Sequence, residues 1–322
     1  MTTENTDLVL LVSDNVWQRE EAAIRSIAPS VTPVIYVGDE PIDDAIIPSI
    51  NAAFYSSDLW PERSRGVALT ILKATNLRWL HTFSAGVDNP FFVQLMERGV
   101  RLTNSSGATA SPIAQTAILY MLALSRNVRA WLRHQDAHEW ERHEFAELDS
   151  ANLVVVGMGP IGNEIARLGT ALNMNVKGIR RTPVGDEPCP TFDFAQLDNA
   201  LAEADWVAVA LPLTPDTREM FDARRLSVMK KGSFFVNVGR GELVDEPALV
   251  AALQSGHLAG AGLDVFAVEP LPADSPLWDM PNVIITPHSS GASPLSGRRA
   301  EKIFLQNLEC WVEGRPLRNE VS

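Results

Sequence analysis

The chain has 322 residues, of which 46% are hydrophobic and 21% charged, so length and composition predict about two ordinary globular domains of roughly 150 residues each. No apolar run approaches the roughly 18 residues that cross a bilayer, and the N-terminus is acidic where a secretory signal is basic, so we expect a cytoplasmic protein. The formal charge of -13 argues against nucleic acid and anionic membranes as partners, and any bound anion must be held by a local basic or dipolar site.

Short apolar runs rich in β-formers alternate with longer helical patterns along the chain, which predicts βαβ units around parallel sheets. The first part contains five such runs, at 7–13, 33–37, 51–56, 78–83 and 100–103. A long apolar segment follows, in which Ser111 is expected to cap a helix that has Pro112 at its first position. We expect this helix to lead from one domain into the other.

A second series of six strands is predicted at 152–156, 175–179, 205–211, 233–238, 260–265 and 282–286. A final helix, from about 291 to 308, is expected to return to the first domain. The predicted fold is therefore α/β, with two doubly wound parallel-sheet domains of the Rossmann or flavodoxin-like kind and a cleft between them. We expect 1–103 plus 291–322 to form the substrate domain and 104–290 to form the dinucleotide-binding domain.

A glycine-rich segment, Gly-Met-Gly-Pro-Ile-Gly, follows the first strand of the second series and precedes an amphipathic helix. Strand, glycines and helix in this order are the context in which such a motif binds a dinucleotide. Gly157 permits the tight turn, Gly159 lets the main chain approach a pyrophosphate, and Gly162 lets the helix pack closely on the strand. The free N–H groups at the helix N-terminus would then bind the anion. A glycine turn that binds nothing is the alternative.

Two adjacent arginines stand where a ribose-binding acid is typical of NAD sites, because the residues roughly 20 positions after the glycines are Arg180 and Arg181. Charge-assisted hydrogen bonds from them would favour a 2′-phosphate by about one to two orders of magnitude. We therefore expect NADP(H) to be preferred and NAD(H) to be possible, with Thr182 as a further phosphate contact. Asp186 and Glu187 lie beyond a proline, too far along to replace the missing acid. A solvated basic strand end is the alternative.

Three titratable residues, Arg240, Glu269 and His288, each follow one of three successive predicted strands. Ligands of open parallel sheets bind beyond the carboxyl ends of the strands, so we expect these side chains to converge on the cofactor. Individually, a surface ion pair, a loop acid and a hydrogen-bonded histidine are the alternatives. Cys189 and Cys310 lie far apart without metal-binding spacing, so neither a disulfide nor a metal site is expected.

The chain resembles the D-isomer-specific 2-hydroxyacid dehydrogenase family over nearly its whole length. The resemblance is carried by the glycine loop, by the segment Leu-Pro-Leu-Thr-Pro-Asp-Thr that begins at Leu211, and by the three segments that contain Arg240, Glu269 and His288. It implies that Arg240, Glu269 and His288 form the catalytic set, and that the protein is a homodimer assembled through its dinucleotide-binding domain. It also implies further cofactor contacts at Pro160, Ile161, Leu211, Pro212, Val238 and Asp264. For Asp264, a structural role in its loop is the alternative.

These roles agree with the chemistry of 2-oxoacid reduction, which needs a hydride at the carbonyl carbon and a proton for the developing alkoxide. His288 suits the proton donor, a role worth roughly 10²–10⁴ in rate. Glu269 would favour the protonated imidazole and fix its orientation. The planar fork of Arg240 would polarise the carbonyl and bind the substrate carboxylate.

A loop in the first part, Phe-Ser-Ala-Gly-Val-Asp, resembles the carboxylate-binding loop of the same family. Its main-chain N–H groups could form a small anion nest, and a plain turn is the alternative. The expected substrate ligands there are Ser84, Ala85, Gly86 and Val87. The chain departs from the family at Gln115 and Thr116, where many relatives have Glu-His, and this leaves the anchoring role of that pair open.

We therefore predict an NADP(H)-preferring D-2-hydroxyacid dehydrogenase or 2-oxoacid reductase, acting on glyoxylate, hydroxypyruvate or a larger 2-oxoacid. Residues that could sort substrates by side chain, such as Tyr55, Ser84, Trp140 and Ser290, form no clear pattern. Trp140 aligns with a tryptophan that reaches a neighbouring subunit in some members of the family, and a core aromatic is its alternative. A nucleotide-sensing binding protein of the co-repressor type is the main rival hypothesis, and formate or phosphite oxidation is a third.

Overall fold

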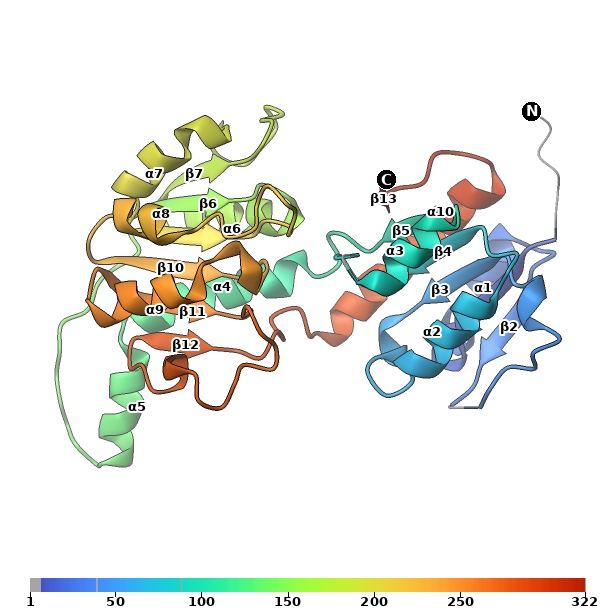
Figure 1. The fold of residues 1–322 in the computed structure, drawn as a ribbon, viewed down its shortest axis with the longest axis horizontal. Helices are drawn as coiled ribbons and strands as arrows, with labels where there is room; N and C mark the ends of the chain where they lie inside the picture. Colours follow the sequence, from blue (N-terminus) through green and yellow to red (C-terminus); the bar gives the residue numbers. More distant parts are fainter. Residues whose placement is uncertain (1–6, 39, 88, 322) are drawn as a thin grey trace. The chain divides into compact units, whose positions relative to one another are not determined.

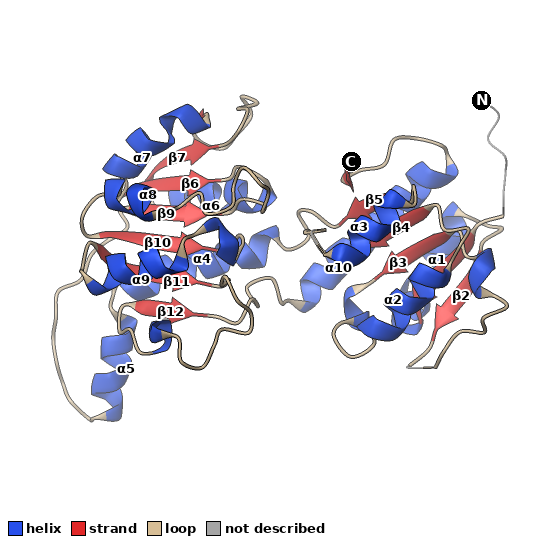
Figure 2. Cartoon of the chain, in the orientation of Figure 1, coloured by secondary structure: helices blue, strands red, loops and turns tan. Residues whose placement is uncertain are grey.

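The computed structural model describes residues 7–38, 40–87 and 89–321, which form two compact units. Unit 1 contains the chain up to Thr109 together with the segment from Ser293 onward, and unit 2 contains Ala110–Ala292. In each unit a β-sheet carries helices on both faces (Figure 1 and Figure 2). No helix in the described ranges is both long enough and apolar enough for a membrane span.

The sheet of unit 1 has the strand order β13-β5-β4-β3-β1-β2, and only β13 runs antiparallel to its neighbour. Order β2-β1-β3-β4-β5 is the flavodoxin-like arrangement. The strands are β1 (Val9–Ser13), β2 (Thr32–Tyr36), β3 (Ala52–Tyr55), β4 (Trp79–Thr82), β5 (Arg101–Asn104) and β13 (Glu320–Val321). The five runs predicted in the first part are all strands, with slightly different ends, whereas the two-residue β13 was not predicted.

Helices cover both faces of this sheet: α1 (Asp14–Ile27), α2 (Ser64–Lys73), α3 (Pro90–Glu97) and α10 (Pro294–Val312). The cores show that α1 and α10 pack on one face, and α2 and α3 on the other. Phe304 of α10 stacks on Phe54 of β3 with ring centroids 4.4 Å apart. His81 of β4 is fully buried in the same core, where its ring nitrogens lie 2.7 Å from Thr103 Oγ1 and 3.0 Å from Ser105 Oγ.

The sheet of unit 2 is entirely parallel, with the strand order β12-β11-β10-β9-β6-β7-β8. The order reverses between β6 and β9, which is the point where doubly wound sheets bind their ligands. The strands are β6 (Asn152–Val156), β7 (Asn175–Ile179), β8 (Thr191–Phe192), β9 (Trp206–Val209), β10 (Ser233–Asn237), β11 (Leu258–Leu263) and β12 (Val283–Ile285). All six predicted strands are present, and β8 is an unpredicted addition at the edge.

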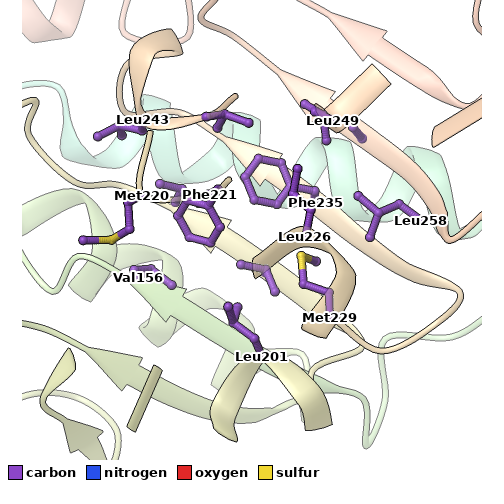
Figure 3. Close-up of a cluster of buried hydrophobic side chains, with 14 of the residues drawn as sticks. Val156, Leu201, Met220, Phe221, Leu226, Met229, Phe235, Leu243, Leu249 and Leu258 are labelled. Carbon is purple, nitrogen blue, oxygen red and sulfur yellow. The ribbon is translucent and has the colours of Figure 1, made fainter. Parts of the chain in front are cut away.

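Two separate cores lie on the two faces of this sheet, because successive strand residues point to opposite sides. The helices are α4 (Ala110–Ser125), α5 (Val128–Asp136), α6 (Pro160–Ala171), α7 (Leu197–Glu203), α8 (Ala223–Val228) and α9 (Glu246–Gln254). Figure 3 shows the core under α7, α8 and α9, which contains Val156, Phe221 and Phe235. Val155, the preceding strand residue, belongs to the opposite core under α4 and α6. Both faces of the sheet are therefore buried, as the near-continuous apolar strands predict.

The start of α4 differs from the prediction. The helix begins at Ala110, so Ser111 is not its N-cap but lies within its first turn. The turn at 106–109 runs directly into the helix, so the first helical residue comes earlier than Ser111. The Ser111 hydroxyl oxygen instead accepts a hydrogen bond from Gln115 Nε2 at 3.3 Å.

α5 and the irregular segment after it extend away from the sheet of unit 2 (Figure 1). Arg129 attaches α5 to the sheet, because its Nη1 donates to the carbonyls of Met280 and Val283 at 2.6 and 2.7 Å. Beyond this attachment, α5 and the segment after it carry exposed aromatic side chains, among them Trp131 at 42% and Trp140 at 92% exposure.

Candidate active site

The glycine loop lies between β6 and α6, next to the point where the strand order reverses. Gly157 has a φ of +105°, and a Cβ there would lie 2.6 Å from the carbonyl oxygen of Ala210. A Cβ on Gly162 would lie 1.8 Å from the Gly157 carbonyl oxygen, so both glycines are required by close packing. Gly159, by contrast, is the exposed N-cap of α6 and faces open space.

These features fit a dinucleotide. The first N–H groups of α6 have no partner within the helix, and they lie beside an N-cap glycine that leaves room for a phosphate. Pro160, at the first helical position, supplies no N–H and is exposed, while Ile161 is half-buried against the core. Asn163 Oδ1 is buried near the same helix start and lacks a hydrogen-bond partner in the described part of the chain.

The arginine loop is joined directly to the glycine loop. The N–H of Gly157 donates to the carbonyl of Ile179, the last residue of β7, at 2.8 Å. Arg180 follows at once, and its own N–H donates to the Phe192 carbonyl at 3.0 Å. The two arginines are therefore next to the glycine loop, and Thr182 is exposed in the same segment.

Each arginine pairs with a carboxylate. Arg180 Nη1 lies 3.0 Å from Glu187 Oε1, and Arg181 Nη2 lies 3.1 Å from Asp216 Oδ2. Glu187 reaches Arg180 because the loop folds back on itself at Gly185, which has a φ of +87°. The Glu187 carboxylate is bound by Arg180 and by the N–H groups of Val184 and Gly185, and the exclusion of Glu187 as a ribose-binding acid stays a prediction.

A third loop, after β9, adjoins the same glycines. A Cβ on Gly157 would lie 2.9 Å from the Leu211 nitrogen, which shows how closely the two loops pack. The Thr217 hydroxyl donates to the Pro212 carbonyl at 2.8 Å and holds the loop closed. The N–H of Val238, at the end of β10, donates to the Val209 carbonyl at 3.0 Å. Loops after four neighbouring strands therefore gather at one sheet edge.

Arg240 lies in the loop after β10. Asn237 Nδ2 donates to the Arg240 carbonyl at 2.9 Å, and Arg240 Nη1 donates to the Gly239 carbonyl at 2.9 Å. The next residue, Gly241, packs so tightly that a Cβ would lie 1.8 Å from the main-chain carbon of Phe266. The loop after β10, which carries Arg240, is thus in direct contact with the loop that leads to Glu269.

His288 and Glu269 form a pair at this edge. His288 Nδ1 lies 2.8 Å from Glu269 Oε2, and Glu269 Oε1 accepts the N–H of Phe266 at 3.0 Å. This contact engages Nδ1, so Nε2 is left for another partner. No partner of Nε2 is found among the described residues, and 47% of the His288 side chain is exposed.

Asp264 holds the loop that carries His288. It is 1% exposed, and its carboxylate accepts hydrogen bonds from Thr286 Oγ1 at 2.5 Å and from the N–H of Ser289 at 2.9 Å. His288 itself has a φ of +48°, a left-handed conformation that its surroundings must impose. The hydroxyl of Tyr120 also bonds to Thr286, and burial raises the pKa of Tyr120, so this hydroxyl stays neutral.

The candidate carboxylate-binding loop follows β4 in unit 1. Ser84 Oγ donates to the Gly86 carbonyl at 2.7 Å, and Asn104 Nδ2 donates to the Ala85 carbonyl at 2.9 Å. No acceptor for the N–H groups of Ala85, Gly86 and Val87 is found within the described ranges. The carbonyls of Ala85 and Gly86 therefore accept hydrogen bonds, whereas the three successive N–H groups can donate to a bound anion.

Two of the residues considered for substrate selection, Tyr55 and Ser290, are buried. Tyr55 is 6% exposed in unit 1, and the hydroxyl of the 9% exposed Ser290 donates to Asp264. Gln115 bonds to Ser111, and Thr116 Oγ1 donates to the Pro112 carbonyl, so both bond within their own helix.

Four residues of the site were not predicted from the sequence. They are the hydrogen-bond or ion-pair partners of predicted site residues or of one another: Thr286, Ser289, Tyr120 and Asp216. Asp216 lies in the quoted segment that begins at Leu211, and Thr286 and Ser289 lie beside His288, but nothing in the sequence indicates which residues they contact.

A doubly wound parallel sheet with this glycine loop defines the class of dinucleotide-binding α/β proteins. Residues 118–290 match the family model described as "D-isomer specific 2-hydroxyacid dehydrogenase, NAD binding domain". A glyoxylate/hydroxypyruvate reductase B of Escherichia fergusonii is 36% identical over 258 residues, which cover 78% of this chain and 79% of that protein. The chain therefore belongs to the D-isomer-specific 2-hydroxyacid dehydrogenase family, an oxidoreductase family.

Solved structures resemble the whole chain. A D-isomer specific 2-hydroxyacid dehydrogenase from Xanthobacter autotrophicus Py2, in complex with NADPH and MES, is 30% identical with a TM-score of 0.78 and 98% of each chain covered. An NADPH-dependent glyoxylate/hydroxypyruvate reductase from Sinorhizobium meliloti, in complex with NADP and sulfate, is 29% identical with a TM-score of 0.77 and the same coverage. These likenesses agree with the two parallel-sheet units described above.

Proposed function

We propose that this protein is an NADPH-preferring reductase of 2-oxoacids, which in reverse oxidises D-2-hydroxyacids. The pair formed by His288 and Glu269, with 2.8 Å between Nδ1 and Oε2, is the observation that carries the proposal. It lies at the same edge of the unit 2 sheet as the glycine loop, and Arg240 lies on a loop in contact with the Glu269 loop. A proton donor, its orienting acid and a permanent cation are the groups that carbonyl reduction requires.

In this proposal His288 donates its Nε2 proton to the alkoxide oxygen that develops from the substrate carbonyl. When bound, a reduced nicotinamide dinucleotide would supply the hydride that the carbonyl carbon needs. Glu269 holds the imidazole by Nδ1 and stabilises its protonated form before the transfer. Arg240 polarises the carbonyl and binds the substrate carboxylate with its planar fork. In unit 1, we assign carboxylate binding to Ser84 and to the N–H groups of Ala85, Gly86 and Val87, for which the described residues supply no acceptor.

The cofactor preference rests on Arg180 and Arg181, with Thr182 as a further contact to the 2′-phosphate. The loops that carry Gly157, Leu211 and Val238 would hold the rest of the dinucleotide. Because both arginines already pair with carboxylates, we expect a preference for NADPH that still permits NADH. Relatives described as NADPH-dependent, or solved with NADPH, support this choice. Glyoxylate and hydroxypyruvate are our first candidate substrates, since a curated relative is named for them.

The test is a panel of 2-oxoacids incubated with NADPH and, separately, with NADH, while the absorbance of the reduced cofactor is followed. The proposal expects turnover of at least one small 2-oxoacid and a higher kcat/KM with NADPH. Binding of NADPH without turnover of any 2-oxoacid would favour the rival hypothesis of a nucleotide-sensing protein. Equal or better kcat/KM with NADH would remove the cofactor preference and leave the reductase assignment intact.

We also propose that a second copy of this chain covers the exposed apolar surface of α4, α5 and the segment after them. That surface carries Leu119, Leu122, Trp131, Leu132, Trp140 and Phe145, each exposed by 38% or more. Such a concentration of exposed large apolar side chains is typical of an interface. Light scattering should give the mass of a dimer for the parent and of a monomer for Leu132→Asp. Leu69→Asp is the matched control, since Leu69 is equally exposed on α2 of unit 1.

A further inference from the structure

The loop after β7 is organised around the carboxylate of Glu187. Its oxygens accept the N–H groups of Val184 and Gly185, both at 2.8 Å, and Arg180 Nη1 lies 3.0 Å away. The N–H of Val184 is the main cause that lowers the pKa of Glu187 to about 2, so the carboxylate is ionised throughout the physiological range. Gly185 has a φ of +87°, which lets the chain turn back so that Glu187 reaches Arg180.

Arg180 is consequently fixed at both ends. Its main chain is bound to β8 through Phe192, and its guanidinium is bound to a side chain that is only 3% exposed. The guanidinium has five N–H donors, and Glu187 is its sole acceptor among the described residues. With 30% of the Arg180 side chain exposed, donors remain for a ligand.

The neighbouring pair has a different character. Arg181 and Asp216 are 69% and 79% exposed, and their shortest contact is 3.1 Å. A pair as exposed as this contributes little to stability and exchanges readily with water and ions. The two arginines are therefore not equivalent, although they are adjacent in sequence. Asp216 also brings a negative charge from the loop after β9 to the surface where a 2′-phosphate is expected.

We infer that Glu187 is a positioning residue that holds Arg180 ready for the 2′-phosphate of NADPH, whereas Asp216 is a counterion of Arg181 that the 2′-phosphate displaces. The inference rests on the cofactor preference proposed above. It assigns opposite effects to two acids that contact adjacent arginines. In Glu187→Gln only one oxygen remains, so the amide NH2 faces either the N–H of Gly185 or the N–H of Val184 together with Arg180 Nη1. The charge is lost as well, so the loop and Arg180 lose support. In Asp216→Asn a negative charge is removed and no buried contact changes.

The test measures binding by calorimetry with two probes that do not depend on catalysis, adenosine 2′,5′-bisphosphate and adenosine 5′-monophosphate. We expect Glu187→Gln to raise the Kd for the bisphosphate about tenfold, the effect of losing one charge-assisted hydrogen bond. We expect Asp216→Asn to lower the same Kd about two- to fivefold. Neither variant should change the Kd for the monophosphate. Gly185→Ala strains the turn without altering any charge, and should weaken bisphosphate binding as Glu187→Gln does.

The outcomes separate the inference from the function on which it rests. If Glu187→Gln binds the bisphosphate as tightly as the parent or more tightly, Glu187 is only a counterion and the inference is wrong, while the 2′-phosphate site stands. The same conclusion follows if Gly185→Ala, folded by circular dichroism, leaves the bisphosphate Kd unchanged. If the parent binds the two probes equally well, the proposed preference for NADPH fails, and the inference fails with it.

Discussion

The main-chain N–H of His288 donates to the main-chain carbonyl of Asp264 at 2.8 Å, so the end of β11 holds the loop that follows β12. The carboxylate of the same aspartate accepts the N–H groups of Ser289 and Ser290. One buried residue therefore binds three successive residues of the loop. Because His288 has a positive φ, this support is what keeps the imidazole in place.

Asp264→Asn should lower kcat by about tenfold to a hundredfold, because it would let the imidazole of His288 move. A displacement of about 1 Å can lower the rate by roughly a hundredfold. The variant should also lose about 1–3 kcal/mol of unfolding free energy, because the amide cannot accept all the hydrogen bonds of the carboxylate. Asp245→Asn is the control, since Asp245 likewise accepts a main-chain N–H, that of Ala248 at 3.1 Å, as the cap of α9. Denaturant unfolding and steady-state kinetics give both quantities. A loss of kcat in Asp245→Asn of the same size would contradict the assignment.

Glu269→Gln should lower kcat by about a hundredfold with a smaller change in KM, because an uncharged amide accepts a weaker hydrogen bond from Nδ1 and does not stabilise a protonated imidazole. Glu246→Gln is the matched control. Glu246 Oε2 accepts the N–H of Ala267 at 3.1 Å in the same loop but has no contact with His288. Steady-state kinetics with the best 2-oxoacid of the panel compares the two. Equal losses in both variants would mean that Glu269 supports the loop and not the imidazole.

Alanine at two glycines of the same loop should have different effects. Gly157→Ala places a side chain at φ +105° and 2.6 Å from a carbonyl oxygen, so we expect a loss of about 1–3 kcal/mol of unfolding free energy. Gly159→Ala meets open space at an ordinary φ of -85°, so its unfolding free energy should stay within about 0.5 kcal/mol of the parent. Its Kd for NADPH should nevertheless rise, which fluorescence titration measures. Unchanged NADPH binding in Gly159→Ala would argue against a pyrophosphate at this helix start.

The stability of unit 1 should depend on pH through His81. Burial lowers the pKa of His81 from an ordinary value of 6.5 to about 3, so the folded protein holds it neutral. The contribution of neutral His81 to the free energy of unfolding is complete above pH 6.5. It declines by up to about 1.4 kcal/mol per pH unit as the pH falls toward 3, because in this range only the unfolded chain takes up the proton. Thermal melts from pH 4 to 8 should show a shallower decline for His81→Gln than for the parent. If the Tm of both proteins declined equally with pH, His81 would not be the cause of the pH dependence.

The sequence predicted the strands and the glycine loop well because both depend on local patterns. Apolar runs between glycine and proline mark buried strands, and the spacing of Gly157, Gly159 and Gly162 is imposed by steric contacts that the structure retains. The ends of elements were less predictable, as at Ser111, because adjacent turns can add residues to a helix. The two-residue strands β8 and β13 have too little sequence to carry a pattern.

The positions of the titratable residues at strand ends could be read from the sequence, but their partners could not. The distance between His288 and Glu269 depends on how two loops fold, and no periodicity describes such loops. The same holds for Glu187, whose contact with Arg180 was not predicted and depends on the turn at Gly185. Hydrogen bonds between residues distant in sequence therefore account for most of what the structure adds.

The short strands β8 and β13 have a consequence for the behaviour of the protein in concentrated solution. Each pairs only two residues onto a longer strand, β7 in unit 2 and β5 in unit 1. An open strand edge offers N–H and C=O groups to other molecules and invites aggregation, and very short terminal strands limit this by leaving little to pair with. At β13, the ion pair between Arg101 and Glu320 adds charge to the same edge. One end of each sheet therefore offers little backbone for edge-to-edge association, because of a strand too short to be predicted from the sequence.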